Sequence, residues 1–433
     1  MFFHKKVKKA AIALVAAMSL AACGAMAEPA IVHADATDTY RDSQLNLDVK
    51  SAIAIDSKTG QILYAKNANK TLPIASMTKL VTVYLTLEAI KKKQISWNTK
   101  VEPTPAIVKV ADNTEYSNVP LKLGHSYTIK QLYQATLIES ANGAAMCLAK
   151  AVAGSQKSFV DQMRAQLKKW HINNAEIYTV CGLPNGNLGK DAYPGVDKNA
   201  ENTMSAKDMA IIGQHLLSEY PSVLNTTKVA HMAFKDGKKT TQMANFNWML
   251  KGLSQYDANF PVDGLKTGTT DAAGACFIGT IKRSGARLIT VVMGAKHKDG
   301  TDPSRFVQTK KLMNYIFKQY SPIVLDSKAT FKNAESVHVA DGKDLSTNVG
   351  LKSKTVLWDP MDGKQVAASL TNKSANAPIS KGQAVTSYTF KSGNEELVSL
   401  DQPNGMRVKA QALQSNGKAN FFVRIWRWIT GVK

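Results

Sequence analysis

Cysteine is scarce in this chain, with four residues in 433, which excludes a fold held together by many disulfides. The eight histidines are scattered, and no HExxH or CxxC pattern indicates a metal site, so we expect neither a metal nor a cofactor. Acidic residues are also few, 33 against 55 lysines and arginines, which makes the formal net charge +22. This imbalance predicts an anionic partner, such as nucleic acid, acidic lipid or an acidic polymer.

Long apolar runs are missing as well. The apolar stretch Ala10–Ala22 is shorter than the roughly 20 residues that span a bilayer, and it follows a lysine-rich start. That combination is typical of a secretory signal peptide, here over residues 1–27. Two processing sites compete, because Ala25-Met-Ala27 predicts simple cleavage whereas Leu20-Ala-Ala-Cys23 resembles a lipobox and predicts lipidation of Cys23. Export argues against a nucleic-acid partner.

The length predicts two or three domains, and the character of the sequence changes near residue 320. Between 46 and 320, strand-like segments at both ends enclose several amphipathic helices, which indicates an α/β domain with a sheet flanked by helices. From 321 to 412, short alternating runs separated by Gly, Asn, Asp and Ser predict a small all-β domain. Residues 28–45 form a polar lead-in, and 413–433 form a separate C-terminal end.

Local patterns place several elements within the α/β domain. Alternating residues around Lys58-Thr-Gly60 predict a β-hairpin, and apolar residues at helical spacing predict helices over 76–90 and 306–319. Thr128-Ile-Lys-Gln131 and Ser205-Ala-Lys-Asp208 are typical of capped helix starts.

The first motif with candidate chemistry is Ser76-Met-Thr-Lys79. The i, i+3 spacing puts both side chains on one helix face, where the lysine amine can reach the serine oxygen. Lysine can then act as the base that a serine nucleophile needs, provided that burial or a neighbouring cation lowers its pKa. The alternative is an ordinary serine in a first helical turn with a solvated lysine. A second SxxK, at Ser415–Lys418, contains Asn-Gly and fits a turn.

The second motif is Ser140-Ala-Asn142, which interrupts a strongly apolar helical stretch. Polar groups embedded there must find partners or face a cavity. The alternative is a helix break with local capping.

The third motif is Lys266-Thr-Gly-Thr269, which precedes a strand-like run. Gly268 would let a substrate approach the backbone closely, and the threonine hydroxyls are suited to hold a carboxylate. Lys266 adds a cation, which we expect to lower the pKa of Lys79 and to attract an anionic substrate. The alternative is a strand edge with a surface lysine.

The order SxxK, SxN, KTG is that of penicillin-binding proteins and class A β-lactamases. Further stretches, Ala52–Asp56, Pro73–Lys79, Val262–Gly268 and Asp271–Cys276, resemble the serine-type D-Ala-D-Ala carboxypeptidases, which are low-molecular-mass penicillin-binding proteins. The resemblance covers nearly all of the mature chain. It implies a penicillin-binding-protein/β-lactamase-like catalytic domain, then a small all-β domain and a C-terminal amphipathic helix. The implied partners are peptidoglycan stem peptides and β-lactam antibiotics.

For the reacting groups, the resemblance implies that Ser76 is the acylated nucleophile and Lys79 its general base. Ser140 would relay a proton toward the leaving D-alanine, and Asn142 would position Lys79 and the substrate amide. Ala141 stands where the family more often has glycine, a change that the site should tolerate.

For substrate binding, the resemblance implies that Lys266 and Thr267 hold the terminal carboxylate beside Gly268. The N–H groups of Ser76 and Thr269 would form the oxyanion hole. Thr269 stands where some members have histidine, so only its backbone role carries over. Arg305 resembles a carboxylate-orienting arginine, and a plain surface arginine is the alternative.

Three other functions remain open at this stage. A class A β-lactamase needs a deacylating glutamate, and no Glu-x-x-Leu-Asn occurs between Ser140 and Lys266. A transpeptidase would use the same acyl-enzyme with a different acceptor. A cell-wall binding protein with a vestigial site would form no acyl-enzyme at all.

The C-terminal end is amphipathic, because Phe421, Ile425, Trp428, Ile429 and Val432 share one face at 100° per residue. Aromatic residues bordered by arginines predict that 419–433 lies on an anionic membrane surface, at the outer face of the cytoplasmic membrane. The alternative is a terminal helix packed on the β domain.

Three cysteines remain in the mature chain. Cys147 and Cys276 lie in apolar segments and are expected to be buried thiols, while Cys181 is in a loop-like segment. Whether any two of them form a disulfide stays open.

Overall fold

The structure is a computed structural model and describes residues 38–431. The predicted leader, including Cys23, and Val432 lie outside the described residues. The centre of the α/β part is a five-stranded sheet in the order β2-β1-β11-β10-β9, in which every neighbouring pair is antiparallel. Its strands are β1 (Ser51–Asp56), β2 (Ile62–Lys66), β9 (Gly264–Thr270), β10 (Gly274–Arg283) and β11 (Ala286–Ala295). The β-hairpin predicted around Lys58-Thr-Gly60 is confirmed as β1–β2.

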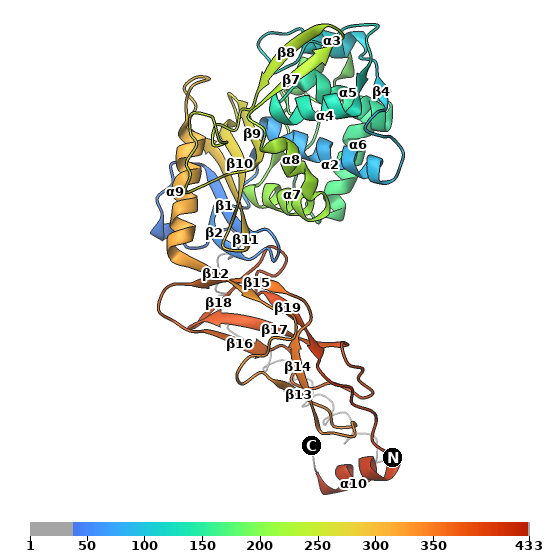
Figure 1. Ribbon diagram of the computed structural model, residues 1–433, viewed down its shortest axis with the longest axis vertical. Helices are drawn as coiled ribbons and strands as arrows, with labels where there is room; N and C mark the ends of the chain where they lie inside the picture. Colours follow the sequence, from blue (N-terminus) through green and yellow to red (C-terminus); the bar gives the residue numbers. More distant parts are fainter. Residues whose placement is uncertain (1–37, 432–433) are drawn as a thin grey trace, which may run out of the picture. The chain divides into compact units, whose positions relative to one another are not determined.

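Side chains alternate between the two faces of this sheet along each strand, and both faces are buried. Ile53 and Ile55 of β1 point into a core shared with most of the helices, whereas Ala52 and Ala54 point into a second core. The second core is covered by α9 (Ser304–Gln319), which lies along one face of the sheet in Figure 1. The predicted α/β class, a sheet flanked by helices, is therefore confirmed.

The helices on the other face come from the chain between β2 and β9, and this excursion also contains several short strands. Its helices are α2 (Lys79–Lys91), α3 (Pro105–Ala111), α4 (Ile129–Ile138), α5 (Asn142–Ala153), α6 (Gln156–Lys169), α7 (Ala206–Glu219) and α8 (Leu224–Thr227). The 3₁₀ turns are η2 (Ala75–Thr78), η3 (Asn185–Asp191) and η4 (Pro221–Val223), and η1 (Asp42–Gln44) precedes the sheet. The short strands are β3 (Leu72–Pro73), β4 (Lys100–Val101), β5 (Tyr127–Thr128), β6 (Thr203–Met204), β7 (His231–Asp236) and β8 (Lys239–Ala244).

Local chemistry explains where two of these helices begin. Thr128 before α4 and Ser205 before α7 each accept a hydrogen bond from the backbone N–H three residues on, and Gln131 and Asp208 reach back to the N-cap backbone. Both capping boxes predicted from the sequence are confirmed. Each pairs two otherwise unsatisfied N–H groups, so the helix starts are fixed by side chains of the helix itself.

Between residues 320 and 412 the elements after α9 are all strands. β12 (Tyr320–Leu325) pairs with β15 (Thr355–Pro360), and a second sheet runs β13-β14-β19-β17-β16 with β18 beside β17. The remaining strands are β13 (Ser336–His338), β14 (Ser346–Leu351), β16 (Val366–Leu370), β17 (Ala384–Ser392), β18 (Glu395–Glu396) and β19 (Arg407–Ala412). Tyr388 and Phe390 of β17 lie at the centre of a separate apolar core. We call this region the β module.

The β module is attached to the central sheet through a buried tryptophan. Trp358 of β15 is fully buried, and its indole N–H donates to Asp56 Oδ2 at 2.9 Å. Its backbone exchanges two hydrogen bonds of 2.8 Å with the side-chain amide of Gln61. Leu400 N–H also donates to the carbonyl of Gly60 at 3.0 Å. Buried polar groups that are all paired favour one fixed arrangement of the parts they join.

Hydrogen bonds of the β module continue past residue 412. Leu413 N–H donates to Asn348, and Asn416 exchanges two backbone bonds with Ile379. Of the predicted end, the described part 413–431 contains one helix, α10 (Phe421–Thr430). Within the described residues, no helix is both long and apolar enough to cross a membrane.

Candidate active site

Three motifs that are far apart in the sequence line one cavity of about 330 Å³ between β9 and the helices. Ser76 comes from η2, Ser140 from the α4–α5 connection, and Thr267 to Thr269 from β9, while Arg305 of α9 closes one end. The rim adds residues that the sequence did not single out: Glu115, Ser117, Phe246, Trp248, His297, Gly300, Asp302 and Phe306.

Ser76 lies on the tight η2 turn just before α2. Ala75 has a φ of 47°, a left-handed conformation that residues with a side chain seldom adopt. The turn is held from the other side by Gly182, where an added Cβ would lie 1.9 Å from the carbonyl oxygen of Ala75. Strained backbone of this kind clusters at functional sites, where the surrounding structure supports it.

Lys79 is completely buried below Ser76. Its Nζ lies 2.8 Å from Ser76 Oγ, 2.7 Å from Asn142 Oδ1 and 2.8 Å from the carbonyl oxygen of Cys181. Burial lowers the pKa of Lys79 to about 8. A neutral amine in this position donates two hydrogen bonds, to Asn142 and Cys181, and keeps its lone pair for the proton of Ser76.

Ser140 and Asn142 break the helical path, as the SxN motif predicted. Ser140 has a φ of 56° and is 3% exposed, and Asn142 is the first residue of α5. While its oxygen accepts from Lys79, the Asn142 amide Nδ2 donates to the carbonyl of Ser117 at 3.1 Å. Since both ends of the amide are paired, Asn142 fixes the direction of the lysine amine.

Lys266 of β9 is buried as well, at 2% exposure. Among the described residues its amine makes one hydrogen bond, to the carbonyl of Thr267 at 3.2 Å. Burial lowers the pKa of Lys266 well below its usual range, and the nearby charges of Lys79 and Arg305 act in the same direction. A buried ammonium with two unused donors favours the arrival of an anion.

Burial is the main cause of the lowered pKa values of both Lys79 and Lys266. The two amines also repel each other when both are protonated, which is the effect of Lys266 that the sequence predicted, and this repulsion acts in the same direction as burial. The carboxylate of Glu139 partly offsets this effect on Lys266. Burial raises the pKa of Glu139 itself.

Gly268 lines the cavity, and the structure adds a packing reason for a glycine there. An added Cβ would lie 2.5 Å from the carbonyl oxygen of Ile74 and 3.2 Å from Met77. The glycine thus lets β9 pack directly on the Ser76 turn. This packing brings Thr269 beside Ser76.

Arg305 is not a surface arginine, because only 7% of it is exposed. Its guanidinium donates to the carbonyl oxygens of Gly268 at 2.9 Å and Cys276 at 3.2 Å, and to Thr269 Oγ1 at 2.7 Å. It therefore ties α9 to the end of β9 while lining the cavity.

Sequence reasoning missed the loop that supports the serine turn from behind. Asn202 accepts from the backbone N–H groups of Tyr178 and Thr179 and donates to Thr78 Oγ1, which joins that loop to η2. The same loop contains Cys181, whose carbonyl oxygen accepts a hydrogen bond from Lys79. Any residue has a carbonyl, so the sequence carries no signal for this contact. The glycine at position 182, where φ is 86°, could have indicated an unusual backbone conformation next to it.

Within residues 38–431 no disulfide is formed, since Cys147, Cys181 and Cys276 are all buried free thiols. This outcome agrees with the expectation for Cys147 and Cys276 and resolves the question left open for Cys181.

Comparison with known proteins identifies the family of this chain. The family model described as D-alanyl-D-alanine carboxypeptidase matches residues 38–297. The D-alanyl-D-alanine carboxypeptidase DacC of Escherichia coli is 29% identical over 395 residues, which cover 89% of this chain and 88% of that protein.

Two solved structures extend the likeness. The crystal structure of a peptidoglycan synthesis regulatory factor (PBP3) from Streptococcus pneumoniae has a TM-score of 0.71 and 34% identity, covering 86% of this chain and 99% of that chain. Penicillin-binding protein D2 from Listeria monocytogenes, in its cefotaxime-bound form, has a TM-score of 0.51 and 30% identity, covering 62% of this chain and 97% of that chain. The chain belongs to the D-alanyl-D-alanine carboxypeptidase family of serine-type hydrolases.

Proposed function

We propose that the cavity removes the terminal D-alanine from peptidoglycan stem pentapeptides through an acyl-enzyme on Ser76. The observation that carries this proposal is the 2.8 Å contact between Ser76 Oγ and the fully buried amine of Lys79. A lysine with a pKa of about 8 is partly neutral near neutral pH, so it can serve as the base that a serine nucleophile requires.

Acylation begins at the pair formed by Ser76 and Lys79. The Lys79 amine takes the proton from Ser76 Oγ, and Oγ forms a bond to the carbonyl carbon of the penultimate D-alanine. The negative charge that develops on the carbonyl oxygen is held by the N–H groups of Ser76 and Thr269. When the C–N bond breaks, the proton passes from Lys79 through Ser140 to the leaving amine of D-alanine.

Substrate recognition rests on the cations around Thr267. The free carboxylate of the terminal D-alanine is positioned by the buried Lys266 amine and by the hydroxyl of Thr267, since Lys266 has two unused donors among the described residues. Arg305 acts from one step further away, because it holds the strand end at Gly268 and Thr269.

Deacylation needs a water in place of the departed D-alanine. That water attacks the Ser76 ester, loses a proton to Lys79 and restores the serine hydroxyl. A penicillin acyl-enzyme keeps its leaving group tethered in the site, and the chain has no Glu-x-x-Leu-Asn in the segment from Ser140 to Lys266. We therefore expect the penicillin adduct to persist, which separates this enzyme from a class A β-lactamase.

The decisive experiment follows D-alanine release from a stem pentapeptide by the full chain. Native protein should release one D-alanine per peptide, and Ser76→Ala should release none. Ser415→Ala is the matched control, because Ser415 begins the other SxxK sequence of the chain and lies in the β module. Joining of two peptides without net hydrolysis would indicate a transpeptidase. Absence of both products would leave a cell-wall binding protein.

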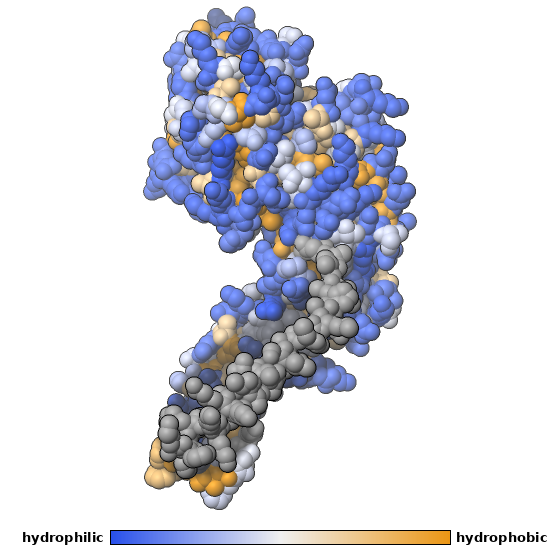
Figure 2. Space-filling view, turned by 180° about the vertical axis from the view of Figure 1, so that it is seen from behind, coloured by the Kyte–Doolittle hydropathy of each residue, from blue (hydrophilic) through white to orange (hydrophobic). Residues whose placement is uncertain are grey.

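We also propose that the protein is exported and that residues 1–27 are its leader. The remaining chain is then divided into a catalytic domain over 46–320, a β domain over 321–412 and a membrane anchor within 413–433. The support for the anchor is that α10 has no buried residue. Its large apolar side chains are exposed, Trp428 at 84% and Phe422 at 80%, and orange atoms gather at α10 in Figure 2. Aromatic side chains of this kind favour the interface of an anionic membrane.

Arg427 attaches α10 to the β module. Its guanidinium donates to the carbonyl oxygens of Gly342 at 2.7 Å and Lys343 at 3.1 Å in the β module. The face of α10 that carries Arg427 is thereby turned to the protein, and the aromatic face is left for lipid. Lipidation at Cys23 would add a second attachment.

A further inference from the structure

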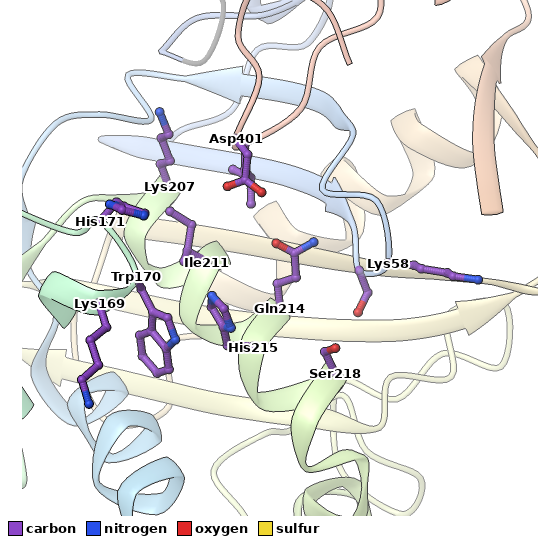
Figure 3. A pocket seen from close by; sticks show the side chains of 12 residues that line it. Lys58, Lys169, Trp170, His171, Lys207, Ile211, Gln214, His215, Ser218 and Asp401 are labelled. Atoms are coloured by element: carbon purple, nitrogen blue, oxygen red, sulfur yellow. The ribbon is translucent and has the colours of Figure 1, made fainter. Parts of the chain in front are cut away.

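Two cavities outside the catalytic site adjoin each other, because both are lined by Lys58 and Asp401. The first, of about 790 Å³, lies along α7, where Lys207, Gln214 and His215 form a row in Figure 3. The second, of about 570 Å³, lies on the β module. We call the two together the basic groove. Its charged side chains are Lys58, Lys169, Lys207, Lys352, Lys354, Asp401, Arg407 and Lys409.

The charge of the basic groove is far from balanced. Seven lysines and arginines face one carboxylate, that of Asp401, whereas the whole chain has 55 basic and 33 acidic residues. The excess in the groove is thus a local feature and does not simply follow from the composition. A concave surface with one sign of charge focuses the field and concentrates counter-ions.

Four of these cations, named below, have no ion-pairing carboxylate among the described residues. Lys354 pairs with the exposed Asp326 at 3.1 Å, and the Lys58 amine donates to the carbonyl of Lys354 at 2.5 Å. Within the described residues, no carboxylate lies within ion-pairing distance of Lys352, Arg407 or Lys409, and Lys169 is in the same situation. Asp401 is also outside ion-pairing distance of all of them.

The unpaired cations are held close together by the backbone. Lys352 N–H donates to the carbonyl of Lys409 at 2.9 Å, so Lys352, which directly follows β14, lies beside Lys409 of the neighbouring strand β19. Arg407 lies on the same strand, β19, two residues away. Like charges in adjacent strands repel one another, and a bound chain of anions would remove this repulsion.

The residues that line the basic groove favour a polymer without nucleobases. They argue against both nucleic acid and a membrane as the ligand. Trp170 is 7% exposed, and its ring stacks on His215 at 4.7 Å, so it offers no free face to a base. The apolar lining residues are buried or half-buried, and none is among the large exposed apolar side chains of the protein. The exposed aromatic side chains that suit a lipid interface are those of α10.

We propose that the basic groove binds a flexible polyanion made of polyol units joined by phosphodiesters. Successive phosphates lie against Lys169 and Lys207 at one end and against Lys352, Arg407 and Lys409 at the other. The site is distinct from the catalytic cavity, since the two share no lining residue. The enzyme would in this way be held on an anionic polymer while Ser76 works elsewhere.

The test measures binding of a labelled glycerol-phosphodiester oligomer to the full chain by fluorescence anisotropy. Affinity should fall by at least about tenfold between roughly 50 and 200 mM salt, because each neutralised phosphate releases counter-ions. The variant Lys352→Gln/Arg407→Gln/Lys409→Gln should bind at least about tenfold more weakly. Its rate of acylation by penicillin should stay unchanged, which reports that it is folded.

The matched control is Lys238→Gln/Lys239→Gln/Lys311→Gln. It removes the same net charge from three exposed lysines outside the groove, and it should keep nearly native affinity. Asp401→Asn provides a test of opposite sign: because it removes the one carboxylate of the groove, affinity should rise on the order of threefold.

Several results would overturn the proposal. Equal losses in the two triple variants would mean that only net charge matters. Equally tight binding of polyglutamate would remove the phosphodiester specificity. Tighter binding of oligothymidylate, or binding only to phosphatidylglycerol vesicles, would assign the groove to nucleic acid or to membrane.

Discussion

Lys79 and Lys266 of the catalytic cavity and Lys352 and Lys409 of the basic groove are the same residue type in opposite surroundings. The first two are almost completely buried and are held among protein dipoles, whereas the second two are exposed on the β module. Burial lowers the pKa of Lys79 to about 8 and lowers that of Lys266 well below its usual range. One pair is thereby prepared for chemistry, and the other is available to attract anions.

The difference teaches what a motif needs before it becomes a site. SxxK occurs twice in the chain, and KTG also occurs twice, at Lys58 and at Lys266. The copies that fold into the catalytic cavity place Lys79 and Lys266 where burial lowers their pKa values. Lys58, the first residue of the other KTG, lines the basic groove instead.

The largest effect that distinguishes the two regions should come from substitution of Lys79, the proposed general base. Lys79→Arg keeps a positive charge but cannot lose its proton, so the acylation rate with benzylpenicillin should fall by about 10³-fold. Lys352→Arg, in the groove, should change that rate by less than about twofold. Stopped-flow measurement of both variants checks this, and comparable losses would erase the distinction.

The next effect separates the groove from the membrane anchor. Deletion of 420–433 removes the exposed aromatic face of α10, so affinity for phosphatidylglycerol vesicles should fall on the order of 100-fold. Binding of the glycerol-phosphodiester oligomer should be unaffected. Co-sedimentation with vesicles gives the first value and anisotropy the second. Unchanged sedimentation of the unlipidated protein would contradict the role proposed for α10.

The pH dependence of acylation should follow Lys79. Its pKa of about 8 lies below the usual lysine range, so the neutral, active form is lost as the pH falls through about 8. Below that point the rate should drop about tenfold per pH unit. A rate constant for benzylpenicillin that does not change down to pH 6 would indicate a base other than Lys79.

A smaller effect tests the support behind Ser76. Gly182→Ala would place a Cβ 1.9 Å from the Ala75 carbonyl at a φ of 86°, so the free energy of unfolding should fall by roughly 2–4 kcal/mol, together with the acylation rate. Gly124→Ala is the control, with a φ of 74° and open space around it. It should cost only about 1 kcal/mol. Equal losses in urea unfolding would mean that backbone strain alone matters at Gly182.

Much of the fold could be read from the sequence because the relevant forces are local. The β1–β2 hairpin follows from alternation around Lys58-Thr-Gly60, and the starts of α4 and α7 follow from side chains within four residues. The order of the three motifs was visible for the same reason. Each is a short string whose chemistry depends on few neighbours.

What could not be read depends on contacts over long sequence distances. The Cys181 carbonyl that receives a hydrogen bond from Lys79 is 102 residues away from it, and a carbonyl has no sequence signature. The close packing of Gly268 on the backbone at Ile74 was not foreseen, because it joins segments far apart in the sequence. The lowered pKa values of Lys79 and Lys266 depend on how deeply each amine is buried, which only the folded chain determines.

The most direct test of the nucleophile is the intact mass of the full chain after incubation with benzylpenicillin, followed by peptide mapping. Native protein and Ser415→Ala should each gain the mass of one penicillin, on the peptide that contains Ser76, and should keep it over many minutes. Ser76→Ala should gain none. An adduct on Ser76→Ala, or no adduct on the native protein, would contradict the assignment of Ser76 as the acylated residue.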